Sequence, residues 1–168
     1  MVNQIYPRVE INLEYLKENV SKIVKLAGEH GVDIAGVIKG TTGLTECAKM
    51  FEEGGVKLIA SSRLEQIEDA KEAGIKLPML LLRVAMLSEV PEVVRLCEVS
   101  LESEKEVLAA LNEEAGKQGK THKVLLMADL GDLREGFWDK DEMVDVAQWV
   151  ENDLKNLVLG GVGTNLGC

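Results

Sequence analysis

The sequence has few cysteines, and they are too scattered to form a disulfide framework. Cys47, Cys97 and Cys168 are the only three, and no two of them make a CxxC pair. The two histidines, His30 and His122, have no further ligand beside them at metal spacing. The sequence therefore predicts no metal site, and it favours buried structural roles for Cys47 and Cys97.

Basic charge is also in short supply. The 19 lysines and arginines face 29 acidic residues, which gives a net charge of -10. A chain this negative repels phosphate backbones and anionic lipid surfaces, so nucleic acid and membranes are poor partners for it. Residues 1–7 show no basic segment leading into an apolar signal core, and no window approaches the ~20 apolar residues of a spanning helix. We expect a cytoplasmic protein.

What the chain does have is a regular alternation of short apolar runs and amphipathic stretches. This alternation predicts a parallel sheet with helices packed outside it, and 168 residues with 46% hydrophobic content suffice for one domain with a real core. Asn12, Ser62 and Ser103 stand where helix N-caps are expected. The expected strands cover residues 33–38, 57–60, 79–82, 95–100, 123–128 and 157–162.

Six such units are two short of a closed (β/α)8 barrel of the TIM type, which typically takes ~250 residues. We therefore expect an α/β fold in which residues 1–168 form an incomplete barrel, with about six of eight strands present. A doubly wound six-stranded sheet is the alternative, but residues 39–43 match neither GxGxxG nor a P-loop. An open barrel exposes two strand edges, so self-association is expected.

Lys39 follows the apolar run 34–38 directly, where a buried strand should end. A lysine held out of water at such a position has a lowered pKa and attacks carbonyls as a neutral amine. Most lysines that close a strand are instead solvated, with only the stem packed on apolar surface. The other polar groups expected at the same barrel mouth are Ser61, Arg83, residues 129–134 and residues 164–165.

Simple structural roles compete with function at these positions. Ser61 can satisfy a backbone group, and Arg83 can pair with a nearby carboxylate. Arg134 lies in a loop between Gly131 and Gly136, where a guanidinium can hold an oxygen anion in planar geometry, although a solvated ion pair is an equal alternative.

Three segments in order carry a resemblance to a known family. They are residues 9–20, the stretch Gly36-Val37-Ile38-Lys39, and residues 129–137 with Asp129-Leu130-Gly131 and Arg134. They resemble the alanine racemase-type (fold type III) enzymes that use pyridoxal 5'-phosphate. The ornithine racemase branch is most similar, through residues 62–65 and 163–166.

The resemblance implies that Lys39 holds pyridoxal phosphate as a Schiff base and moves the substrate's α proton on one face. It places Arg134 near the phenolic oxygen of the cofactor ring. Asn165, with Thr164 beside it, takes the place of a histidine packed near the cofactor. Gly43 replaces a tyrosine that reaches the cofactor phosphate, so phosphate binding differs here or comes from elsewhere.

The implied activity is that of a pyridoxal phosphate-dependent amino acid racemase, an isomerase whose substrate is a small molecule, an amino acid. In the resembled enzymes the second acid-base group comes from the C-terminal β domain of a partner subunit, which implies a homodimer. Residues 1–168 contain no such domain, so we expect them to be inactive alone. Asp132 and Glu135 put negative charge near the expected mouth, which would favour a basic amino acid.

Two other functions remain open at this point. One is a non-catalytic pyridoxal phosphate-binding barrel that keeps the lysine. The other is an unrelated magnesium-dependent barrel lyase that uses Asp129, Asp132 and Glu135, whose spacing does not reproduce an EF-hand loop.

Overall fold

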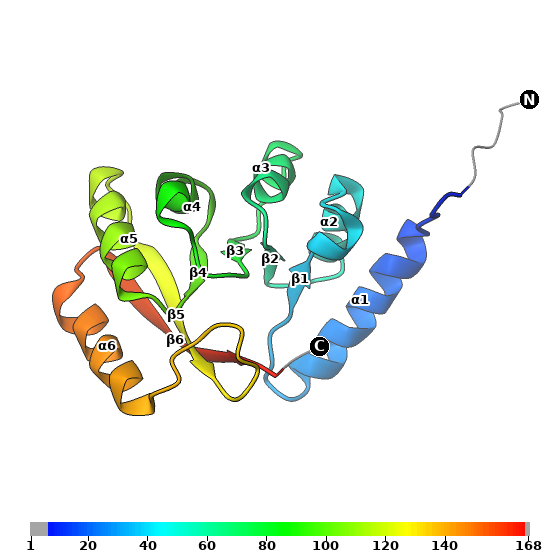
Figure 1. The fold of residues 1–168 in the computed structure, drawn as a ribbon. Helices are drawn as coiled ribbons and strands as arrows, with labels where there is room; N and C mark the ends of the chain where they lie inside the picture. The colour runs from blue at the N-terminus through cyan, green and yellow to red at the C-terminus, as the bar shows by residue number, and fades with distance from the viewer. Residues whose placement is uncertain (1–6, 167–168) are drawn as a thin grey trace, which may run out of the picture.

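The computed structural model describes residues 7–166, which form six strands alternating with helices (Figure 1). Among these residues no helix combines the length and the apolar character needed to cross a lipid bilayer. The elements are α1 (Leu13–Gly28), β1 (Ala35–Val37), η1 (Lys39–Thr41), α2 (Thr45–Glu53), β2 (Leu58–Ser61), α3 (Leu64–Glu72), β3 (Met79–Leu81), η2 (Leu87–Glu89), α4 (Val90–Leu96), β4 (Val99–Glu102), α5 (Lys105–Lys117), β5 (His122–Asp129), α6 (Lys140–Asp153) and β6 (Leu157–Asn165).

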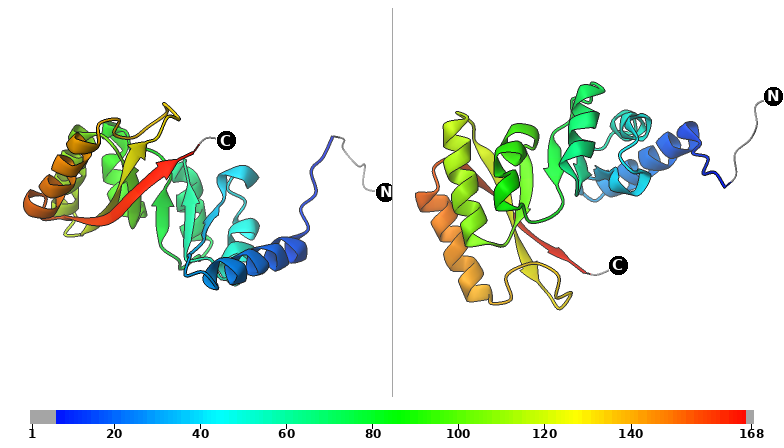
Figure 2. Two further views of the ribbon diagram at one scale, coloured as in Figure 1. Left: turned by 90° about the horizontal axis from the view of Figure 1, so that it is seen from below. Right: turned by 45° about the horizontal axis from the view of Figure 1, so that its top comes forward.

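The strands lie side by side in sequence order, β1-β2-β3-β4-β5-β6, and every neighbouring pair is parallel. The six α-helices form an arc along one side of the curved sheet (Figures 1 and 2). A doubly wound sheet would reverse its strand order at a switch point, and this sheet does not. The expected incomplete barrel is confirmed, with β1 and β6 as its outer strands.

Local sequence signals explain some helix starts and fail at others. Asn12 caps α1 as predicted, because its side chain accepts a hydrogen bond from the backbone N–H of Tyr15 at 3.0 Å. Ser62 and Ser103 are not caps, since α3 and α5 begin one residue later than predicted, after Arg63 and Glu104. At both helices the cap residue makes no side-chain capping bond.

The expected strand 95–100 is wrong at its start. Arg95 and Leu96 belong to α4, and β4 begins only at Val99. The run from Val90 to Cys97 is apolar enough to satisfy either period, and a short buried helix cannot be told from a strand by periodicity alone. The sixth strand, in contrast, runs three residues beyond its predicted end, to Asn165.

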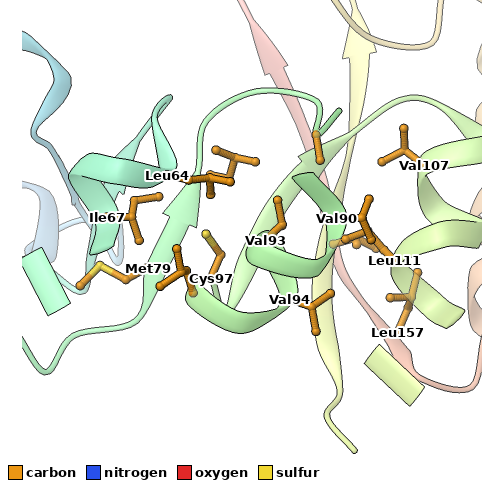
Figure 3. Packing of buried hydrophobic residues seen from close by; sticks show 14 of the residues in the cluster. Leu64, Ile67, Met79, Val90, Val93, Val94, Cys97, Val107, Leu111 and Leu157 are labelled. Atoms are coloured by element: carbon orange, nitrogen blue, oxygen red, sulfur yellow. The ribbon is translucent and has the colours of Figure 1, made fainter. Parts of the chain in front are cut away.

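The main core lies between the sheet and its helices, on what we call the helix-covered face. Strand residues such as Ile59, Leu81 and Leu126 are fully buried there. Met79 of β3 belongs to the same cluster as the helix residues Ile67 and Leu111 (Figure 3). Cys47 and Cys97 are both buried and free, as predicted, while Cys168 lies outside the described residues.

The opposite face of the sheet, the helix-free face, carries a second and smaller apolar cluster. Its buried members are Ala60, Leu80, Val99, Leu101 and Met127. Side chains alternate between the two faces along each strand, so these residues interleave with those of the main core. In a closed barrel this face would be the interior.

Candidate functional site

Lys39 stands at the carboxyl end of β1, where the chain leaves the sheet in a tight turn. The backbone N–H of Ile38 still donates to the carbonyl of Ala60 at 2.9 Å, so pairing with β2 ends one residue before Lys39. The carbonyl of Ile38 then accepts from the N–H groups of Thr41 at 3.1 Å and Gly43 at 3.0 Å. These bonds fix the position of the Lys39 backbone.

The side chain of Lys39 is exposed, and within residues 7–166 it makes no hydrogen bond or ion pair. The expected shielding from water is therefore not found. The physical reason is that β1 is an outer strand, so no neighbouring strand or loop encloses its end on that side. The amine is unpaired and accessible, and a dry environment would have to come from a group that covers it.

Ser61 and Arg83 have the structural roles that competed with function. The Ser61 hydroxyl donates to Gln66 Oε1 at 2.6 Å and accepts from the Arg63 N–H at 3.2 Å, which holds the start of α3. Arg83 pairs with Glu89 at 2.8 Å and donates to the carbonyl of Ser62 at 2.8 Å. The hydrogen bond from Arg83 is the main cause of the lowered pKa of Glu89.

The loop of residues 130–136 is shaped by Asp129, the last residue of β5. One oxygen of Asp129 accepts hydrogen bonds from the N–H groups of Gly131 at 2.7 Å and Leu133 at 3.2 Å. These donors, Gly131 first, lower the pKa of Asp129. The carboxylate is thus committed to the loop backbone.

The base of the same loop is closed by backbone pairing. Phe137 donates to the Met127 carbonyl at 2.8 Å, and Asp129 donates to the Phe137 carbonyl at 3.0 Å. Gly136 has a φ of 120°, and a Cβ there would lie 2.5 Å from the backbone nitrogen of Asp129. Lys140 bonds three carbonyls around this closure. The loop therefore leaves and rejoins the sheet at a fixed place.

Arg134, Glu135 and Asn165 come together across the ends of β5 and β6. Asn165 donates from Nδ2 to Glu135, and Arg134 Nε lies 3.6 Å from the other Glu135 oxygen. Thr164 precedes Asn165 in β6, so its side chain points to the opposite face, and its hydroxyl bonds only the Asn165 carbonyl, at 3.3 Å. Arg134 and Asn165 thus share a cluster that Thr164 does not enter.

Sequence reasoning missed Glu102, the last residue of β4. It is 0% exposed, and within the described residues neither carboxylate oxygen has a hydrogen-bond partner. Burial raises the pKa of Glu102 to about 7. On the same face of the sheet, the side chains of Ser100 and His122 share a 2.9 Å hydrogen bond. Burial lowers the pKa of His122 to about 4. The expected strand ended at residue 100, so Glu102 fell outside it and was not recognised as a buried strand residue.

The acidic residues proposed for magnesium do not gather into a metal site. No group of three histidine, cysteine, aspartate or glutamate side chains in residues 7–166 is arranged to hold a metal ion. Asp129 is bonded to its loop backbone, and Glu135 is bonded to Asn165. Asp132 is the loop carboxylate that makes no hydrogen bond or ion pair within the described part.

The described residues fit part of pyridoxal phosphate. The unpaired amine of Lys39 suits its aldehyde, and the half-exposed guanidinium of Arg134 suits its ring oxygen. A phosphate cradle is not formed at Gly43, whose N–H is used by Ile38. A larger residue at Gly43 would also strike Gln66, since its Cβ would lie 2.6 Å from that side chain.

Comparison with known proteins finds relatives that match almost the whole chain. Lysine racemase of Thermotoga maritima is 34% identical over 98% of this chain, and ornithine racemase of Acetoanaerobium sticklandii is 33% identical over 98%. The chain spans 45% and 46% of the length of these relatives. D-threonine aldolase from Filomicrobium marinum shares the fold with a TM-score of 0.82 at 18% identity, over 94% of this chain and 43% of that chain.

A family match covers almost the whole chain. Residues 11–168 match the family described as alanine racemase, N-terminal domain, and this span includes the Lys39 turn, the 130–136 loop and β6. Of the three segments that carried the resemblance in the sequence, the first leads into α1 and the other two reach the carboxyl ends of β1 and β5. The chain belongs to the alanine racemase N-terminal domain family.

Proposed function

We propose that the whole protein is a pyridoxal phosphate-dependent amino acid racemase in which Lys39 binds the cofactor. The observation that carries the proposal is the unpaired amine of Lys39 at the carboxyl end of β1, in a chain that belongs to this family. Carboxyl ends of barrel strands are where such folds place their chemistry. The names of the two relatives, lysine racemase and ornithine racemase, support the reaction type.

Lys39, Arg134 and Asn165 would have different roles in this reaction. When bound, pyridoxal phosphate supplies an electron sink that makes the proton beside the substrate carboxylate removable. Lys39 Nζ would remove that proton from one face as a general base, and in the reverse direction it would deliver a proton to that face as a general acid, while the acid-base group of the opposite face does the converse. Arg134 holds an oxygen anion of the cofactor ring with its guanidinium, and Asn165 lines the same side of the site.

Several parts of the site would come from outside the described chain. We propose that residues 1–168 are the N-terminal part of the barrel, and that the remaining strands and a C-terminal β domain complete it. The phosphate cradle and the acid-base group of the opposite face would lie there, the latter on a partner subunit of a homodimer. Residues 1–168 alone would then be inactive, and robust racemisation by them would contradict this division. The cytoplasmic location stays a prediction.

The substrate class that we propose is an amino acid with a second amino group. The names of both relatives support it, because lysine and ornithine each carry a distal ammonium. In this chain Asp132 is the loop carboxylate free to attract that ammonium, since Glu135 is bonded to Asn165. Comparing kcat/KM of the whole protein for ornithine, lysine and alanine tests this, and a preference for alanine would contradict it.

Borohydride trapping tests the central role of Lys39. The whole protein is incubated with pyridoxal phosphate, reduced and digested, and the labelled peptide is mapped. We expect the label on Lys39, its loss in Lys39→Arg, and its retention in Lys49→Arg, which alters an exposed lysine of α2. A label on another lysine would refute the assignment. Trapping on Lys39 without racemisation would favour the non-catalytic binding protein, and activity lost only on chelation would favour the lyase.

A further inference from the structure

Glu135 is the residue that connects the two proposed cofactor contacts. One of its carboxylate oxygens accepts the hydrogen bond from Asn165 Nδ2, and the other lies 3.6 Å from Arg134 Nε. The Glu135 side chain is 12% exposed, whereas that of Arg134 is 46% exposed. A carboxylate this enclosed, with partners on two different elements, is held in one orientation by charge-assisted contacts.

The contact with Glu135 determines which nitrogens of Arg134 remain available as hydrogen-bond donors. It uses Nε, and within the described residues the two terminal guanidinium nitrogens have no partner. Arginine presents its donors in a rigid planar fork, so an ion pair at Nε restricts the directions in which the other nitrogens point. Without Glu135 this half-exposed side chain would sample many rotamers, each of which costs entropy to order again.

The same carboxylate fixes the amide of Asn165. Because Nδ2 donates to Glu135, the amide oxygen of Asn165 is directed elsewhere and remains free to accept a hydrogen bond. Within residues 7–166, this is also the one hydrogen bond that joins the 130–136 loop to β6. The loop position and the amide orientation therefore depend on one side chain.

We infer that Glu135 is a positioning residue, which holds Arg134 as a donor and Asn165 as an acceptor toward the proposed cofactor site. The inference rests on the proposed function, because pyridoxal phosphate is the ligand that Arg134 and Asn165 would contact. Glu135 itself touches neither substrate nor cofactor, and this differs from a role in attracting a basic substrate, because its oxygens are already occupied.

The link between Glu135 and Asn165 is tested first by urea unfolding of the whole protein. The variants are Glu135→Ala, Asn165→Ala and the double variant, compared in a double-mutant cycle. We expect each single substitution to lower the folding equilibrium constant, and the double variant to be about tenfold more stable than the sum of the singles predicts. Glu135→Gln keeps an oxygen that accepts from Asn165 and should retain most of this coupling. Additive losses would overturn the inference.

The positioning role is tested by titrating the whole protein with pyridoxal phosphate and following absorbance. Glu135→Ala should raise the Kd for pyridoxal phosphate about tenfold, and Glu135→Gln about threefold, because only the contact with Arg134 is lost. In an Arg134→Ala background, Glu135→Ala should add only about threefold, the part that passes through Asn165. Glu104 lines a surface pocket together with Arg134 and Glu135, and its exposed carboxylate has no partner in the described part of the chain. Glu104→Ala is therefore the matched control, and its Kd should stay within twofold of the wild type.

The outcomes separate this inference from the proposed function. Trapping on Lys39 together with an unchanged Kd in Glu135→Ala would overturn the inference alone. Equal weakening by Glu135→Ala and Glu104→Ala would also overturn it, because the effect would then be one of general charge. Absence of trapping on Lys39 would overturn the proposed function, and the positioning role with it.

Discussion

On its helix-covered face the sheet buries a continuous layer of side chains against α2 to α6, whereas on its helix-free face the same strands bury only a small cluster. The difference arises from alternation, because neighbouring residues of one strand meet two different environments. Residues of the covered face serve stability, since most of them are buried in close contact with the helices. The open face and the strand ends beside it are where Lys39, Arg134 and Asn165 remain accessible.

Two carboxylates at the ends of neighbouring strands show the same contrast. Glu102 ends β4 on the covered face, where its carboxylate has no hydrogen-bond partner among residues 7–166, and burial raises its pKa to about 7. Asp129 ends β5, pairs in register with Asn165 and accepts two backbone N–H groups, which lower its pKa. Burial on the covered face thus favours the neutral form of Glu102, whereas the N–H groups of the loop favour the charged form of Asp129.

The largest expected effect is a cavity in the covered face. Leu111 of α5 is 0% exposed and lies in the main core (Figure 3), so Leu111→Ala should lower the free energy of unfolding by about 3 to 5 kcal/mol. Leu80 of β3 is 8% exposed on the helix-free face, so Leu80→Ala should cost about 2 kcal/mol or less. Urea unfolding measures both, and equal losses would remove the contrast between the faces.

The next effect concerns two groups buried on the covered face. Glu102 keeps its proton in the folded chain up to about pH 7 but loses it near pH 4.5 when unfolded. On its own, it makes stability fall as pH rises from about 4.5 to 7, because the folded state binds more protons. His122 is neutral in the folded chain down to about pH 4 but binds a proton below about pH 6.5 when unfolded. On its own, it makes stability rise with pH over that interval.

Between about pH 4.5 and 6.5 these two slopes oppose each other, so they nearly cancel in the wild type. His122→Gln should leave the Glu102 slope, with stability falling by about 1.4 kcal/mol per pH unit toward pH 6.5. Glu102→Gln should leave the opposite slope of similar size. Urea midpoints at half-unit pH intervals measure this, and parallel curves for all three proteins would refute it.

The features that could be predicted from the sequence were those that depend on local residue patterns. The sheet and its strand order followed from apolar alternation, and Asn12 and Lys39 were placed correctly because local pattern alone determines them. Glu102 could not be found, because its burial depends on where β4 begins and on helices distant in sequence. The contact of Glu135 with Asn165 spans 30 residues and depends on strand pairing, which periodicity does not specify.

Substituting a glycine on each face should compare the two faces through smaller losses of stability. A Cβ on Gly36 would lie 2.7 Å from the ring of Phe51, which is packed against the main core, so Gly36→Ala should cost about 1 to 3 kcal/mol. A Cβ on Gly163 would lie 2.9 Å from the sulfur of Met127, a flexible side chain of the smaller cluster that can shift to make room. Gly163→Ala should therefore cost less than about 0.5 kcal/mol. Thermal unfolding ranks the pair, and a larger loss at Gly163 would contradict it.

The smallest expected effect is on stability, at Val158 of β6. This side chain is exposed unless a second copy of the protein covers it. Val158 is 44% exposed, so Val158→Thr should change stability by less than about 0.5 kcal/mol, because the new hydroxyl reaches water and both residues are β-branched. Val124→Thr on the covered face should cost about 1 to 3 kcal/mol, since its hydroxyl is buried. Measured over a range of protein concentrations, a cost at Val158 that grows with concentration would mean that a second copy covers this edge, as expected for an open sheet. A cost that is large at every concentration would instead contradict the open face itself.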